Sequence, residues 1–139
     1  MVKHFEKKLP ARKEELNELL ALIEENLEAA GCPMKSQTAV LVSFEEIFVN
    51  VASYAFPDDE DGEAEFIFDI DDEARKASLT LKDDGIPFDP FSQAAPDLSL
   101  SAEERRIGGL GIFMVKKMMD EVSYQYSGGF NITTIVKNF

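Results

Sequence analysis

Glu46 and Asn50 form the first pair of side chains that could do chemistry. They are four residues apart, so a helix would place them on one face. The stretch around them, from about Ser36 to Ala55, is the most apolar of the chain, and a carboxylate and an amide are costly to bury there without partners. The pair is therefore either part of a binding site or an ordinary pair that faces solvent or caps a neighbouring strand.

Asp83 and Gly85 form a second candidate site. Asp83 ends an apolar segment, ASLTLKD, in which Leu79 and Leu81 share one face of a predicted strand. A carboxylate at a strand end can accept a hydrogen bond from an amino group, and a glycine beside it lets a ligand approach the backbone. An Asp-Asp-Gly turn without function would show the same residues.

Residues 108–111, Gly-Gly-Leu-Gly, open a helical segment and form a third candidate site. Glycines there leave backbone N–H groups facing outward, and a helix N-terminus adds partial positive charge, so the segment could bind phosphate. Arg105 and Arg106 lie directly before it. It is not a Walker A loop, because no Lys-Ser or Lys-Thr follows. A flexible loop that starts with glycine explains these residues alone equally well.

Together the three segments supply what a nucleotide with magnesium needs. The helix start at 108–111 would bind phosphate, and Asp83 would accept a hydrogen bond from an amino group. Magnesium prefers hard oxygen ligands and keeps several waters, so the amide oxygen of Asn50 and the phosphates would suffice. Glu46, one helical turn away, could then act as a general base.

Three helices are expected to position these sites. Pro10 fits the first turn of a helix that Gly31 ends, and its leucines recur at helical spacing. Ser36 is expected to cap a second, largely buried helix that runs to about Ala55. A third helix is expected to open at Gly108 and to run to about residue 119.

Strands fill most of the remaining chain. They are predicted at about residues 1–8, 64–71, 77–83, 121–127 and 131–138. A long polar segment with three prolines, from Asp84 to Gly108, separates the second hairpin strand from the third helix. Because it lacks periodicity and is this long, we expect a mobile lid over about 91–107.

The order of elements predicts an α+β fold. Strands adjacent in sequence pair as hairpins, so the mixed sheet should be mainly antiparallel. The three helices should cover one face of it, giving a two-layer sandwich. The length of 139 residues predicts a single domain over 1–139.

Composition excludes several kinds of protein. The 14 basic residues against 27 acidic ones give a net charge of −13, which disfavours nucleic acid and anionic membranes as partners. Cys32 is the single cysteine and His4 the single histidine, so disulfides and a Cys/His metal site are not expected. With no apolar leader at its start, the chain is expected to be cytoplasmic.

The order of the motifs resembles a known superfamily. E-x-x-x-N at 46–50, D-x-G at 83–85, a variable segment and G-x-G at 109–111 resemble the GHKL ATPases of gyrase, MutL and histidine kinases. DDGIPFDP at 83–90 and RIGGLGIFMVKKMMDEVSYQY at 106–126 resemble the anti-sigma factor serine-protein kinases within it. The tail NITTIVKNF is similar to the closing strand of that group, and the resemblance covers about residues 8–139.

The resemblance implies the histidine-kinase-like ATPase fold, ATP and Mg²⁺ as cofactors, and a role for each motif residue. These roles are a Mg²⁺ ligand (Asn50), the base that activates the substrate hydroxyl (Glu46), the acceptor for the adenine amino group (Asp83), room beneath the base (Gly85), backbone donors to the phosphates (Gly109, Leu110 and Gly111), a phosphate contact of the lid (Arg105 or Arg106) and support for adenine (Thr134).

The resemblance also implies partners and shows two departures. It implies a homodimer that sequesters a sigma factor or similar client and phosphorylates a serine on an antagonist protein. Tyr54 stands where related kinases often carry histidine, and Pro87 replaces the second glycine of D-x-G-x-G, which stiffens that loop.

Two other functions fit the same residues. One is a nucleotide-gated protein-binding module of the same fold without phosphoryl transfer. The other is a small α+β interaction domain that binds no nucleotide. Nucleotide-dependent melting separates the last from the first two, because a ligand that binds only the folded state raises its stability.

Overall fold

The computed structural model describes residues 1–56, 62–92 and 109–139. The phosphate contact predicted for Arg105 or Arg106 lies outside these residues, as does nearly all of the predicted lid. The helices and strands, in chain order, are β1 (Val2–Pro10), a 3₁₀ turn (Lys13–Glu15), α1 (Leu16–Ala29), α2 (Met34–Asn50), a π-helical turn (Val51–Ala55), β2 (Glu63–Asp71), β3 (Lys76–Asp83), a 3₁₀ turn (Pro90–Ser92), α3 (Gly109–Met118), β4 (Glu121–Ser127) and β5 (Phe130–Asn138).

The five strands form one antiparallel sheet in the order β1-β2-β3-β5-β4. The hairpins β2–β3 and β4–β5 were expected from the sequence, and each pairs as predicted. The sheet has no parallel pair among the described strands, so it is antiparallel rather than mixed. β3 and β5 are central neighbours, which brings the end of β3 beside the start of β5.

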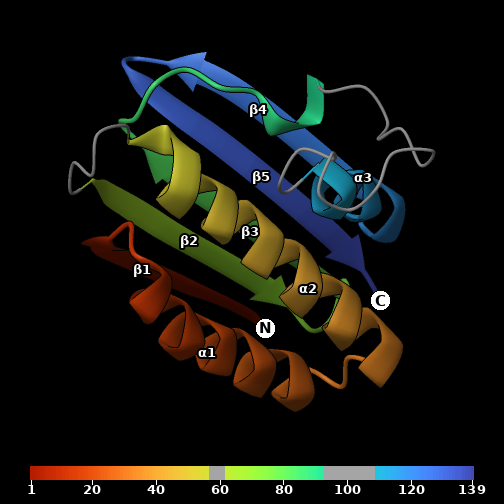
Figure 1. The fold of residues 1–139 in the computed structure, drawn as a ribbon. Helices are drawn as coiled ribbons and strands as arrows, with labels where there is room; N and C mark the ends of the chain where they lie inside the picture. The colour runs from red at the N-terminus through yellow and green to blue at the C-terminus, as the bar shows by residue number, and fades with distance from the viewer. Residues whose placement is uncertain (57–61, 93–108) are drawn as a thin grey trace.

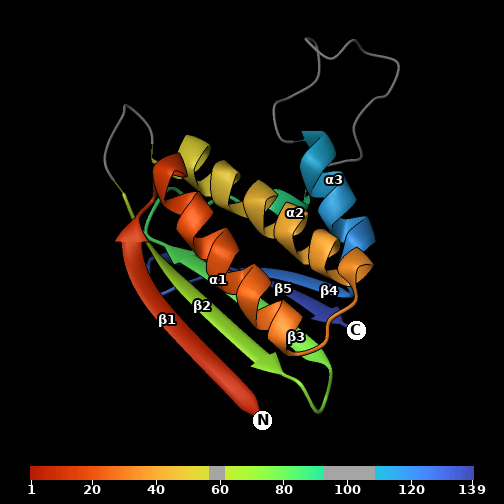
Figure 2. The same cartoon turned by 90° about the horizontal axis from the view of Figure 1, so that it is seen from below.

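The three helices cover one face of the sheet, as predicted (Figure 1 and Figure 2). α2 lies between α1 and α3 and packs against both of them, and its inner side rests on β3 and β5. Alternate residues of β2 and β3 point into this layer, and Phe66, Phe68, Leu79 and Leu81 are at most 2% exposed. The structure is therefore a two-layer α+β sandwich with the core between the layers.

α1 ends where the sequence predicted, at Gly31. The N–H of Gly31 donates to the carbonyl of Glu28 and that of Cys32 to the carbonyl of Leu27, at 3.0 Å each. This pattern is a Schellman motif, which needs a left-handed residue after the helix, and Gly31 supplies it with φ of 76°.

Two predicted helix starts were wrong. Pro10 is the last residue of β1, opposite Glu63, rather than the first turn of a helix. A proline is tolerated there because β1 is an edge strand. α2 begins at Met34, and its cap is the extended Pro33 rather than Ser36. The N–H of Gln37 already donates to the carbonyl of Pro33, so the helix has begun before Ser36.

The end of α2 matches the prediction. After Asn50 the helix widens into the π turn Val51–Ala55, and Phe56 leaves it in an extended conformation. The whole segment, Met34–Ala55, is 22 residues long and apolar enough to span a membrane by length and composition. Its inner face packs on the sheet, so we interpret it as the core helix of this sandwich.

Candidate functional site

Asp83 lies at the end of β3 with its carboxylate buried, 2% exposed. Its Oδ1 atom accepts two hydrogen bonds, from the N–H of Gly85 at 2.9 Å and from Nδ2 of Asn131 at 3.0 Å. None of the described residues donates to Oδ2, which leaves that atom as an acceptor for a ligand. Burial raises the pKa of Asp83, and the two hydrogen bonds lower it in part.

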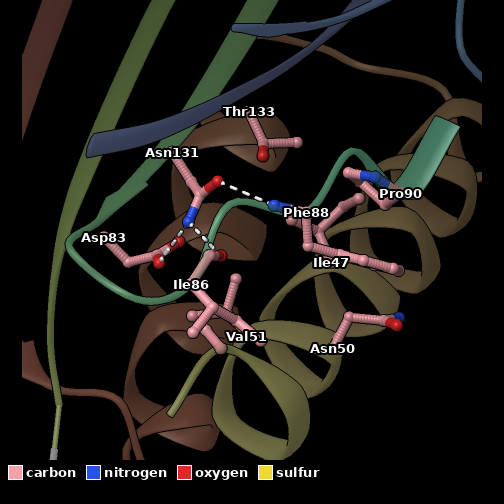
Figure 3. Close-up of a pocket in the computed structure, with 10 residues that line it drawn as sticks. Ile47, Asn50, Val51, Asp83, Ile86, Phe88, Pro90, Asn131 and Thr133 are labelled. Carbon is pink, nitrogen blue, oxygen red and sulfur yellow. Dashed lines mark hydrogen bonds between the residues drawn. The ribbon is translucent and has the colours of Figure 1, made fainter. Parts of the chain in front are cut away.

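A pocket opens beside Asp83, between the sheet and the end of α2 (Figure 3). It holds about 350 Å³ of empty space, part of it open to solvent. Its lining is mostly apolar, with a few polar groups, as in many small-molecule sites. The lining residues are Ile47, Asn50, Val51, Ala55, Asp83, Ile86, Phe88, Pro90, Asn131 and Thr133.

The enclosed part of this pocket is narrow and has room for about one or two water molecules. Ile86 and Phe88 form one wall of the pocket, and these side chains are 49% and 38% exposed. Because exposed side chains change rotamer readily, a flat aromatic ligand could enter if this wall moves outward.

Asn50 and Glu46 lie one turn apart on α2, as their spacing predicted. The Nδ2 group of Asn50 donates to the backbone carbonyl of Glu46 at 2.7 Å, so the amide oxygen is the atom that could coordinate a metal. Asn50 lines the pocket together with Asp83. The Glu46 carboxyl is half-buried, and burial raises its pKa, with a further rise from the neighbouring Glu45 carboxylate.

The Glu46 carboxylate reaches the first turn of α3. A Cβ atom built on Gly111 would overlap Oε1, Oε2 and the carboxyl carbon of Glu46. Gly111 therefore lets the carboxylate approach the helix N-terminus, where partial positive charge stabilises an anion. Gly109 and Leu110 belong to the same turn, so their backbone N–H groups lie at the start of α3.

Gly85 lets two backbone segments approach each other. A Cβ atom at this position would overlap the carbonyl oxygen of Ala55, the last residue of the π turn. The next residue, Ile86, donates its N–H to that same oxygen at 2.9 Å. The predicted room at Gly85 is therefore filled by the end of the α2 segment, and Gly85 fixes the distance between this segment and the end of β3.

Thr134 does not line the pocket, and its predicted place was wrong. It pairs with Thr80 of β3, and the two hydroxyl oxygens are 3.0 Å apart. Thr80 lies between Leu79 and Leu81, which face the helices, so Thr80 and Thr134 face the opposite side of the sheet. The adjacent Thr133 lines the pocket instead.

Sequence reasoning also missed Asn131 and Tyr124. Asn131 is 4% exposed. Its amide group donates hydrogen bonds to Asp83 and to the loop that follows Asp83 (Figure 3). Tyr124 on β4 donates its hydroxyl to Oδ1 of Asn131. The available signal was a polar residue at an inward position of a central strand, because a buried amide needs partners there.

These residues fit a nucleotide with magnesium on chemical grounds. The free Oδ2 of Asp83 suits an amino group, and the amide oxygen of Asn50 suits a hard cation. Among the residues that the structure describes, no group of three or more His, Cys, Asp or Glu side chains could hold a metal. A magnesium ion would therefore depend on Asn50, water and the ligand's own phosphates.

Comparison with known proteins places the chain in a family. The histidine kinase-like ATPase domain family matches residues 9–137, so the chain belongs to this family. Within it, the chain is similar to proteins named serine-protein kinase RsbW. It is 29% identical to that of Listeria monocytogenes over 107 residues, which cover 74% of this chain and 67% of the relative.

A second relative and a solved structure are also similar to this chain, the structure in its fold alone. The chain is 24% identical to the serine-protein kinase RsbW of Bacillus subtilis over 134 residues, 93% of this chain and 82% of the relative. Its fold is similar to a crystal structure of the RsbU and RsbW domains of a Mycobacterium tuberculosis protein, with a TM-score of 0.68 and 12% identity. The similarity covers 98% of this chain, which spans 32% of that structure's chain.

Proposed function

We propose that this chain is an ATP-binding serine-protein kinase that acts as an anti-sigma factor. It would phosphorylate a serine on an antagonist protein and sequester a sigma factor or similar client. The observation that carries the proposal is that Asp83 and Asn50 line the same pocket. Glu46 lies one turn before Asn50 on α2, and its carboxylate contacts the start of α3. Relatives named serine-protein kinases support the same class.

Each side chain would have one task. Oδ2 of Asp83 accepts a hydrogen bond from the amino group of adenine, while the apolar side chains of Ile47 and Ile86 contact the faces of the base. The amide oxygen of Asn50 coordinates magnesium, which when bound neutralises charge on the phosphates. The backbone N–H groups of the first turn of α3 bind phosphate oxygens.

Glu46 would act as the general base. Its raised pKa makes the carboxylate a stronger proton acceptor than an exposed glutamate, which suits removal of a proton from a serine hydroxyl. In the structure the carboxylate contacts the start of α3, where phosphates would bind. Phosphate binding would therefore push the carboxylate away from Gly111 and toward the incoming hydroxyl, because two anions repel each other.

The remaining assignments are part of the same proposal. Arg105 or Arg106 would contact the terminal phosphate from the lid, and an arginine can bind a phosphate with two hydrogen bonds. The chain would work as one cytoplasmic domain and as a homodimer. The edge strands β1 and β4 end the sheet in the described part of the chain, and each could pair with a second copy.

A phosphoryl-transfer assay tests the proposal. The chain would be incubated with Mg-ATP and candidate antagonist proteins encoded nearby, with phosphoserine measured by mass spectrometry. Glu46→Gln keeps the shape of the side chain and removes the base, so transfer should fall by about 10²–10⁴-fold while nucleotide binding remains. Glu45→Gln is the matched control, because Glu45 is the exposed neighbour on the same helix.

Two outcomes would contradict the assigned roles. Equal transfer rates in Glu46→Gln and the unsubstituted chain would remove Glu46 as the base. Nucleotide binding without transfer to any candidate would favour a nucleotide-gated protein-binding module of the same fold.

A further inference from the structure

Asn131 has no task in the proposed function, yet its buried side chain makes several hydrogen bonds. Its Nδ2 group donates to Oδ1 of Asp83 at 3.0 Å, to the carbonyl of Ile86 at 2.9 Å and to that of Gly85 at 3.3 Å. Its Oδ1 atom accepts from the N–H of Phe88 at 3.2 Å and from the hydroxyl of Tyr124. One buried amide therefore connects β4, β5 and the end of β3.

These partners allow only one orientation of the amide. Both donors, the Tyr124 hydroxyl and the Phe88 N–H, lie at the oxygen end of the amide. The acceptors lie at its nitrogen end, and Figure 3 shows the bonds to Asp83, Ile86 and Phe88. A flipped amide would place its oxygen against the Asp83 carboxylate and its N–H₂ group against an N–H donor, leaving buried polar atoms without partners.

This orientation decides which atom of Asp83 remains for a ligand. Oδ1 is occupied by the amide of Asn131 and by the N–H of Gly85. The carboxylate cannot rotate without breaking these two hydrogen bonds. Its second oxygen, Oδ2, therefore has a fixed direction, and it is an acceptor as long as the carboxylate is ionised.

We propose that Asn131, oriented by Tyr124, is a positioning residue that makes the pocket select a 6-aminopurine over a 6-oxopurine. The inference rests on the proposed function, because it takes a purine nucleotide as the ligand. A 6-amino group donates to Oδ2 of Asp83. A 6-oxo group is an acceptor, and it would face the same oxygen without a proton between them, which a site built on hydrogen bonds rejects.

Replacing Asn131 by leucine should remove this preference. Leucine is similar in size but donates no hydrogen bond to Oδ1 of Asp83. Because the hydrogen bond from Asn131 lowers the pKa of the Asp83 carboxyl, its loss favours the protonated carboxyl, which can donate a hydrogen bond. A protonated Asp83 pairs with a 6-oxo group, so the variant should bind inosine diphosphate better and adenosine diphosphate worse than the unsubstituted chain.

The experiment measures the ratio of two affinities in the full chain. Mg-ADP and Mg-IDP would be titrated by calorimetry into the unsubstituted chain, Asn131→Leu and Tyr124→Phe. We expect a preference for ADP of about tenfold or more in the unsubstituted chain and near equality in Asn131→Leu. Tyr124→Phe removes one of the two donors that orient the amide, so the preference should fall by about threefold or more.

Tyr126→Phe is the matched control. Tyr126 lies on β4, as Tyr124 does, and it pairs with Asn131 of β5. It is 49% exposed. Loss of its hydroxyl should leave the ratio unchanged. A purely structural role of Asn131 would lower both affinities together and keep their ratio, so the ratio separates positioning from stability.

The outcomes are distinct. An ADP preference that persists unchanged in Asn131→Leu and Tyr124→Phe would overturn this inference and leave the proposed function standing. If Asn131→Leu does not fold, Tyr124→Phe decides alone. Binding of neither nucleotide by the unsubstituted chain would overturn the proposed function, and this inference with it.

Discussion

The carboxylate of Asp83 is buried at a cost to the fold. It is 2% exposed, and only one of its two oxygens has donors among the described residues. Burial raises the pKa of Asp83, so the ionised form is destabilised in the fold without a ligand. An amino group that donates to Oδ2 would offset part of that cost, which supports the proposed role of Asp83 in binding.

Asn50 carries a prediction at the same scale. Asn50→Ala removes the amide oxygen that we assign to magnesium, so ADP affinity should lose its dependence on the metal. In the unsubstituted chain, Mg²⁺ should strengthen ADP binding by about tenfold or more, since one good ligand contributes on the order of 1–2 kcal/mol.

Calorimetric titration with ADP, in Mg²⁺ and in EDTA, measures this difference. The metal-free affinity should be similar in both proteins. If Mg²⁺ strengthens ADP binding equally in Asn50→Ala, another group holds the metal.

The sequence predicted the residue types of the site better than their directions. Successive residues of β5 face opposite sides of the sheet, which divides them into two sets. One set is Ile132, Thr134 and Val136, and the other is Asn131, Thr133 and Ile135. The first set is more apolar, yet the second faces the helices. Pairing with β3 decides this, because Thr80 opposite Thr134 and Leu81 opposite Thr133 fix the face. No local pattern contains that information.

Two glycines show how elements are fitted together around the pocket. Gly85 brings the loop after β3 against the π turn that follows α2, and Gly111 brings α3 against Glu46 on α2. π turns of this kind occur often at functional sites, since they redirect the chain at one point of a helix. The arrangement around the pocket thus depends on two close contacts between elements that are distant in sequence.

The two glycines should respond differently to alanine. At Gly85 the added Cβ overlaps a backbone carbonyl, which can move only with the π turn. At Gly111 it overlaps the end of a flexible carboxylate side chain. Denaturant unfolding should show Gly85→Ala destabilised by about 2 kcal/mol or more and Gly111→Ala by clearly less.

Phosphoryl transfer would add a second comparison, because the added Cβ lies at the start of α3, where phosphates would bind, and Gly111→Ala should therefore slow transfer even where the fold is intact. Equal loss of stability in the two variants would mean that the Glu46 carboxylate cannot leave the start of α3.

The positions of the elements were largely predictable, whereas their ends were not. The strands near 64–71 and 77–83 differ from β2 and β3 by one residue at the start, because alternation and a polar turn define them. The start of α1 was misplaced since Pro10 suits both a helix start and an edge strand. Only the pairing with β2 distinguishes the two.

At the scale of the whole molecule, the site lies where the two layers meet at one end of α2 (Figure 1). Asp83 lies on the sheet and Glu46 lies in the helix layer. Burial is the main cause that raises the pKa of each carboxyl. Each therefore binds a proton more tightly in the folded chain than in the unfolded chain. By linkage, their contribution makes the free energy of unfolding fall as pH rises above the unfolded values.

Asp83→Asn should reduce this pH dependence. For Asp83 the fall begins near its ordinary pKa of 3.8 and ends at its higher folded pKa. The variant cannot ionise, so its free energy of unfolding should decline less with pH in that window and should be no lower than that of the unsubstituted chain at neutral pH. Urea unfolding at a series of pH values measures both slopes, and parallel slopes would mean that burial of the Asp83 charge carries no penalty.

The most direct measurement is calorimetric titration of Mg-ADP into the unsubstituted chain and into Asp83→Asn. Asparagine keeps an oxygen for Asn131 and Gly85, and it replaces the charged acceptor by an amide. We expect the unsubstituted chain to bind one nucleotide per chain. Asp83→Asn should bind the nucleotide about tenfold more weakly, since a charge-assisted hydrogen bond is lost. Equal affinities in two folded proteins, or no binding by the unsubstituted chain, would contradict the assignment of this pocket to an adenine nucleotide.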